Sequence, residues 1–156
     1  MVSRVFSLGL PTLVLCALLG MLVGLGTYTF VYAQGGSYLS DNPEACINCH
    51  VMREHFDGWQ KSPHHAVATC NDCHVPHDFV GKWLAKGEHG YRHSKAFTLQ
   101  NFHEPIRITD ADLGIVRANC VRCHEGLVEQ INVNSAHAQG ADCVHCHARV
   151  AHGPVR

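Results

Sequence analysis

Three things are scarce in this sequence, and each scarcity excludes a class of protein. Basic residues do not outnumber acidic ones: 12 Lys and Arg face 13 Asp and Glu, for a net charge of −1, which argues against a nucleic-acid partner. Charge is missing altogether from residues 5–33. Leu, Ile, Val and Phe are sparse from Gln34 onward, where they make up 25 of 123 residues. A folded domain this poor in core side chains needs another source of buried apolar mass.

The uncharged run near the N-terminus predicts a membrane anchor. Its 29 residues would form a helix that crosses a hydrocarbon core of about 30 Å with tilt. A cleaved signal peptide is the alternative, but its apolar region usually has only about 7–15 residues. Arg4 precedes the run, which favours an N-terminus in the cytoplasm and the rest of the chain in the periplasm. We therefore expect an anchor at 1–34 and a periplasmic domain at 35–156, with Gly20 and Gly24 offering a weak self-association motif.

Cysteine and histidine are abundant, with nine and fourteen copies, and eight cysteines fall into one repeated pattern. The pattern C-x-x-C-H is typical of covalent haem attachment, where two thiols bind one haem c and the histidine lies beneath the iron. One copy alone would also suit a redox pair or half of a zinc site. Four copies predict four covalently bound haem c groups. The attaching cysteines are Cys46 and Cys49, Cys70 and Cys73, Cys120 and Cys123, and Cys143 and Cys146, and the histidines that follow them are His50, His74, His124 and His147.

The motifs form two close pairs, because they begin 24, 50 and 23 residues apart. The stretch "SPHHAVATCNDCH" at the second motif is echoed by "SAHAQGADCVHCH" at the fourth. The repeat predicts a compact multihaem domain built as two dihaem halves, mainly α with much irregular structure and almost no sheet. Haems held by so little intervening chain lie close together and pass electrons rapidly.

Ten histidines besides those that end the motifs compete to bind the opposite faces of the four irons, although His145 lies inside its own motif and is badly placed to reach the opposite face of that haem. His65 lies five residues before Cys70 and His152 lies five residues after His147, so these two are the strongest candidates. The others are His55, His64, His77, His89, His93, His103, His137 and His145.

The middle segment predicts an amphipathic helix, because Lys82, Lys86, His89 and His93 share one face at helical spacing. Two interpretations stay open. In one, the helix packs its apolar side on haem and leaves its lysines in solvent. In the other, it lies along the membrane interface, where Trp83 helps to anchor it and the basic strip lines a quinol pocket.

The first motif raises its own question, since Met52 lies two residues beyond His50. The motif by itself assigns the iron to His50. A thioether ligand in its place would raise the haem potential relative to histidine.

Several stretches resemble the NapC/NirT/NrfH family of membrane-anchored multihaem quinol dehydrogenases, in particular its small tetrahaem subunits of cytochrome c nitrite reductase. They are the N-terminal span, "SYLSDNPEACINCHVM", "SPHHAVATCNDCH", "YRHSKAFT", "NCVRCH" and "CVHCHARVAHG".

The resemblance implies a set of iron ligands. Met52 would displace His50 at haem 1, and His74 would bind haem 2 opposite a lysine from the catalytic partner. Haem 3 would take His124 and His152, and haem 4 would take His147 and His65.

The resemblance also implies a menaquinol site beside haem 1, to which Lys86 belongs. Where some relatives have an aspartate, this chain has His93, which leaves haem 1 either five-coordinate or bound by His93. The protons released by quinol would pass to His93, Lys86 or Glu88.

The expected function is oxidation of menaquinol and delivery of electrons to a periplasmic catalytic subunit, the pentahaem nitrite reductase NrfA. Three rivals remain: the same chemistry feeding another reductase such as periplasmic nitrate reductase, an electron-transfer cytochrome without a quinol site, and a zinc-binding structural module.

Overall fold

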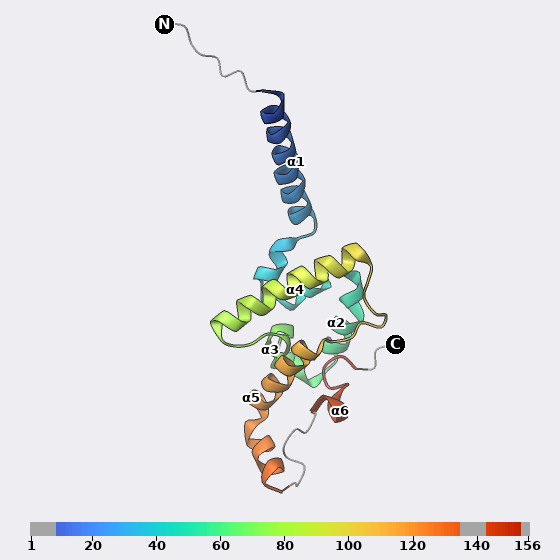
Figure 1. Ribbon diagram of the computed structural model, residues 1–156. Helices are drawn as coiled ribbons and strands as arrows, with labels where there is room; N and C mark the ends of the chain where they lie inside the picture. The colour runs from blue at the N-terminus through green and yellow to red at the C-terminus, as the bar shows by residue number, and fades with distance from the viewer. Residues whose placement is uncertain (1–8, 135–142, 154–156) are drawn as a thin grey trace. The chain divides into compact units, whose positions relative to one another are not determined.

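The computed structural model describes residues 9–134 and 143–153, and Arg4 and the repeat segment 135–142 lie outside these ranges (Figure 1). Helices and short 3₁₀ turns make up all the regular structure there, and the described residues contain no strand. The prediction of a mainly α chain with much irregular structure is confirmed. The elements are α1 (Leu10–Tyr32), η1 (Gly35–Leu39), η2 (Pro43–Asn48), η3 (His50–Met52), α2 (Arg53–Gln60), η4 (Pro63–Ala66), α3 (Cys70–His74), α4 (Phe79–Leu99), α5 (Asp110–Asn134) and α6 (Cys143–His147).

The chain divides into two compact units, Met1–Gly36 and Ser37–Arg156. The first unit carries α1, whose 23 residues include an 18-residue stretch with a mean hydropathy of 2.1 and no buried side chain. At about 1.5 Å per residue such a helix is long enough to cross a bilayer core. Pro11 opens the helix at a position where the missing N–H costs nothing. Among the described residues, α1 is the one helix with the length and composition of a membrane span.

The second unit has a small apolar core. Its buried apolar side chains, among the described residues, are Trp59, Val75 and Ala85. A unit of this size held by protein contacts alone would bury many more aliphatic side chains. The low content of aliphatic residues in the sequence is therefore matched by a small apolar core in the fold. Such a core is expected where covalently bound cofactors supply much of the buried apolar mass.

One buried polar side chain joins two helices of this unit. Asn119 in α5 is 6% exposed, and its amide donates hydrogen bonds to the backbone oxygens of Cys73 and Val75, both at 3.0 Å. These carbonyls lie at the end of α3, where a helix leaves its last oxygens without internal partners. Helix α3 packs against α5 through this contact.

Helix α4 is the long helix predicted for the middle segment (Figure 1). Asp78 caps its start by accepting a hydrogen bond from the Gly81 backbone N–H at 2.7 Å. Gln100 ends it in the left-handed conformation, with φ of 53°. The two glycines in its middle do not interrupt it. One of its residues, Lys86, lies close enough to the first motif for its charge to help lower the pKa of Cys46.

Candidate functional site

Two of the four C-x-x-C-H motifs form one turn of helix each, and a third lies inside α5. Helices α3 and α6 begin at the first cysteine and end at the histidine of their motifs. Cysteines three residues apart then share a face, with the histidine beside them. In α5 the backbone leaves helical geometry at His124, with φ of −110° and ψ of 23°. Each arrangement presents two thiols and an imidazole to one side, as a covalently bound haem requires.

The first motif is built differently. Cys46 lies in η2, but Cys49 is extended, with φ of −91° and ψ of 116°, before a new 3₁₀ turn begins at His50. The break changes the direction of the His50 side chain relative to the cysteines. His50 is exposed, whereas Met52 is half-buried. In this motif the thioether, not the imidazole, is the more enclosed side chain.

The thiols of successive motifs lie close enough to affect one another's ionisation. A hydrogen bond from Cys70 lowers the pKa of Cys46 to about 7, so the first and second motifs meet. Burial raises the pKa of Cys73, and the charge of Cys120 raises it further. Burial raises the pKa of Cys120 in the same way, with a further contribution from Cys143. The attachment points therefore follow one another in space in the order of the sequence.

The second cysteine is exposed in three of the four motifs. Cys49, Cys123 and Cys146 lie at the surface, whereas Cys73 and the first cysteine of each motif are half-buried. Cys123 and Cys146 each follow a half-buried cysteine by one helical turn. No disulfide joins any of the nine cysteines, all of which the structure describes. Haem attachment through all eight cysteines stays a prediction.

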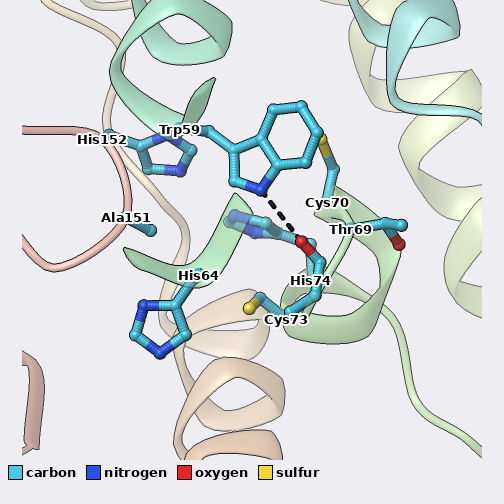
Figure 2. Close-up of a pocket in the computed structure, with 9 residues that line it drawn as sticks. Trp59, His64, Thr69, Cys70, Cys73, His74, Ala151 and His152 are labelled. Carbon is cyan, nitrogen blue, oxygen red and sulfur yellow. Dashed lines mark hydrogen bonds between the residues drawn. The ribbon is translucent and has the colours of Figure 1, made fainter. Parts of the chain in front are cut away.

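A pocket surrounds the second motif (Figure 2). Its lining residues come from segments far apart in the chain: Trp59, His64, Ala68, Thr69, Cys70, Cys73, His74, Ala151 and His152. The Trp59 indole N–H donates to the Ala68 carbonyl oxygen at 2.9 Å, which fixes one wall. Burial lowers the pKa of His74 to about 4. A neutral imidazole beside two thiols is the form that binds a metal, so this site fits a covalently attached haem.

His152, from the C-terminal segment, lies at the same pocket. Its ring centroid is 5.9 Å from that of His74 and 5.2 Å from that of His55. Its Nδ1 is 3.0 Å from the His55 carbonyl oxygen. A hydrogen bond from Nδ1 to a backbone oxygen is the usual support of a ligand histidine, because it leaves Nε2 available to the metal.

His64 also lies at the pocket, although the sequence favoured His65. The Nδ1 atom of His64 is buried and has no hydrogen-bond partner among the described residues. Its ring centroid lies 6.2 Å from that of His124. His65 is exposed and packs its ring edge-on against Trp59 at 4.7 Å. A buried nitrogen without a partner is costly in protein alone, and a haem iron would satisfy it.

A signal for His64 is present in the sequence. It lies six residues before Cys70, as His137 does before Cys143, whereas the residue matching His65 in the second copy is Ala138.

The basic strip of α4 points into the domain, and its lysines have polar partners. Lys82 and Lys86 both contact Asp41, and His89 Nε2 lies 2.9 Å from an Asp112 carboxylate oxygen. Lys86 is 6% exposed. The apolar arc carries the exposed side chains of the helix: Phe79, Val80, Trp83, Leu84 and Tyr91. The interpretation that leaves the lysines in solvent is therefore wrong, because the paired face is the basic one.

His93 is held by Tyr38. The Tyr38 hydroxyl lies 2.9 Å from His93 Nδ1, and burial raises the pKa of Tyr38 to about 12, so this residue stays protonated. Desolvation and the charge of His89, whose ring stacks at 5.8 Å, lower the pKa of His93. In the tautomer whose Nδ1–H donates to the Tyr38 oxygen, Nε2 is the nitrogen left for iron or for a proton. Glu88 lies elsewhere, paired with Arg92 at 2.6 Å on the solvent side of the helix.

The other predicted ligands are distributed as follows. His74 lies in the pocket of Figure 2, while His147 ends α6 and is exposed. The pairing of His124 with His152 and of His147 with His65 stays a prediction.

Comparison with known proteins gives one family. The profile described as NapC/NirT cytochrome c family, N-terminal region, matches residues 10–112. Cytochrome c-type protein NrfH of Wolinella succinogenes is 38% identical, with 86% of this chain and 81% of the relative covered. Cytochrome c-type protein NapC of Escherichia coli is 31% identical, with coverage of 93% and 82%.

A solved structure is also similar. A chain in the crystal structure of the cytochrome c nitrite reductase NrfHA complex, bound to the HQNO inhibitor, superposes with a TM-score of 0.63 at 30% identity. The match covers 92% of both chains.

Proposed function

Since this chain belongs to the NapC/NirT cytochrome c family, we propose that it is a membrane-anchored tetrahaem cytochrome that oxidises menaquinol and supplies a periplasmic catalytic subunit with electrons. The apolar helix α1 and the four attachment motifs support this proposal. In it, residues 1–34 form the anchor, with the N-terminus in the cytoplasm, and residues 35–156 form the periplasmic haem domain. The two dihaem halves rest on the sequence repeat alone.

The break at Cys49 is the observation that carries the proposal, because it distinguishes one haem site from the other three. We assign Met52 as the protein ligand at that site, with His50 turned toward solvent. Each bound haem c supplies a one-electron carrier. A site that differs from the rest suits the entry point, where the donor is an organic two-electron molecule.

The residues of α4 serve the quinol in this proposal. Quinol oxidation releases two electrons and two protons, so a proton acceptor is needed beside the electron acceptor. His93 is the preferred acceptor through Nε2, since its Nδ1 is held by Tyr38. Lys86 lies near the first motif, where its charge contributes to the lowered pKa of Cys46. Glu88, paired with Arg92 on the outer surface, is better placed to relay a proton to water.

For the remaining haems we propose His74 at haem 2 with a partner's lysine, His124 with His152 at haem 3, and His147 with His65 at haem 4. The orphaned nitrogen of His64 makes it a second candidate beside His65. Replacing each by Ala separates them: the variant that loses its ligand should convert one low-spin haem signal to high spin by electron paramagnetic resonance. The other variant should keep the parent spectrum.

The partner that the similarities favour is the nitrite reductase subunit NrfA, because the similar solved structure is an NrfHA complex. The similarity to NapC of Escherichia coli supports a second candidate, in which the same quinol chemistry feeds another periplasmic reductase.

Purified protein in liposomes tests the function. Pyridine haemochrome absorbance should give about four haems per chain, which the zinc module would not. Menadiol, a menaquinol analogue, should reduce the haems under anaerobic conditions, with dithionite as the reference for full reduction. If dithionite reduces the haems and menadiol does not, the protein is an electron-transfer cytochrome without a quinol site. Adding NrfA and nitrite should then give menadiol-dependent nitrite loss, and a response only to periplasmic nitrate reductase would favour the second candidate.

A further inference from the structure

Lys86 is an unusual lysine, because its ammonium group is buried in a domain with little core. Its Nζ donates hydrogen bonds to the Ser40 carbonyl oxygen and to Asp41 Oδ1, both at 2.7 Å. Both acceptors belong to the short connection between η1 and η2, more than forty residues earlier in the chain. A buried cation is stable only where such partners replace water.

Asp41 is itself fixed from several directions. Its Oδ2 accepts a hydrogen bond from Lys82 Nζ at 2.5 Å, and its Oδ1 accepts one from Asn71 at 2.8 Å. The bonds from Lys82 and then Lys86 hold the pKa of Asp41 well below its usual range, so the carboxylate remains charged. Asn71 follows Cys70, which ties this cluster to the second attachment motif. Asp41 therefore acts as a rigid anion shared by two lysines.

The hydrogen bonds leave one donor of Lys86 available. An ammonium group has three N–H bonds, and Ser40 and Asp41 use two of them. Among residues 9–134 and 143–153, no further acceptor is hydrogen-bonded to Nζ; the Trp83 ring centroid lies 5.5 Å away. The third N–H has a direction set by the other two.

We infer that Asp41 is a positioning residue, which with Ser40 orients Lys86 so that its third N–H donates a hydrogen bond to a quinol oxygen. This inference rests on the proposed function. In this role Lys86 acts as a hydrogen-bond donor. The two quinol protons leave through other groups, of which His93 is the preferred candidate, and the two electrons leave through the haems.

The test compares Asp41→Asn with Asp110→Asn, which removes one exposed carboxylate from the start of α5. Asp41→Asn keeps the shape of the side chain and weakens its hold on Lys86. Binding of the quinol analogue HQNO should weaken about tenfold, as expected when a charge-assisted hydrogen bond loses its geometry. The KM for menadiol should rise while haem content and the haem spectra stay unchanged. Asp110→Asn should behave as the parent protein.

A double-mutant cycle separates positioning from a general structural effect. If Asp41 acts through Lys86, the variant Asp41→Asn/Lys86→Met should bind HQNO no more weakly than Lys86→Met alone. Additive losses, or loss of haem from Asp41→Asn, would overturn the inference. If menadiol reduces the parent protein and Asp41→Asn binds HQNO as tightly as the parent does, the inference is also overturned. No reduction of the parent protein by menadiol would instead refute the proposed function.

Discussion

Removing the Asn119 side chain should destabilise the haem domain more than any comparable loss of a surface amide. Its two hydrogen bonds, both 3.0 Å long, reach the Cys73 and Val75 carbonyl oxygens at the end of α3. Val75 is buried, so water cannot readily replace the lost donor there. A buried polar group left unsatisfied costs about 1–3 kcal/mol. With two acceptors affected, Asn119→Ala should lower the free energy of unfolding by about 2–4 kcal/mol.

Thermal unfolding of the detergent-solubilised holoprotein, followed by far-ultraviolet circular dichroism, measures this effect. For a domain of this size the expected fall in Tm is roughly 10 °C. Asn119→Asp should fare no better, because an ionised carboxylate accepts hydrogen bonds and cannot donate them. Asn101→Ala is the control, since Asn101 is exposed beyond the end of α4, and should change Tm little. Equal shifts for Asn119→Ala and Asn101→Ala would refute the reasoning.

Three further predictions follow from other contacts. A Cβ at Gly58 in α2 would collide with the His152 carbonyl oxygen, so Gly58→Ala should lower Tm and, if His152 binds haem 3 as proposed, disturb the spectrum of that haem. A Cβ at Gly87 in α4 meets open space, so Gly87→Ala should raise the free energy of unfolding by up to about 1 kcal/mol. Similar Tm shifts for Gly58→Ala and Gly87→Ala would contradict the predicted collision at Gly58. The pKa of Asp41 in the folded state lies below its ordinary 3.8, so the carboxylate stabilises the fold above pH 3.8 and loses this effect as the pH falls. Asp41→Asn should therefore flatten the pH dependence of Tm below about pH 4. An unchanged pH dependence of Tm in that range would argue against this role of Asp41. Met52→Leu should alter one haem spectrum and abolish menadiol oxidation, and an unchanged spectrum would favour His50.

The sequence was sufficient for features that depend on local pattern. The uncharged run became α1, and the i, i+4, i+7 spacing from Lys82 became one face of α4. The scarcity of aliphatic residues after Gln34 correctly indicated a domain with little core of its own. These features could be predicted because periodicity and composition are properties of the sequence itself and do not depend on which distant segments come into contact.

The residues that pair with the basic strip could not be predicted from the sequence, because they come from distant segments of the chain. Asp41 lies more than forty residues before Lys86, and Asp112 lies 23 residues after His89. Helical spacing places four basic side chains on one face but does not say whether that face meets water or protein. The choice between His64 and His65 likewise depends on which ring reaches the pocket, although the repeat contained a hint.

The difference among the haem motifs has a physical origin in where each helix starts. Thr69 immediately precedes Cys70 and forms a capping box with Asp72, whose carboxylate accepts from the Thr69 N–H at 2.7 Å, so a full turn of helix begins at the motif. In the first motif the cap is Asn42, four residues before Cys46. The 3₁₀ turn that starts there ends at Asn48, before the motif is complete. The position of the cap relative to the cysteines thus breaks the first motif at Cys49, so that His50 and Met52 belong to a separate 3₁₀ turn in which Met52 is the more enclosed of the two.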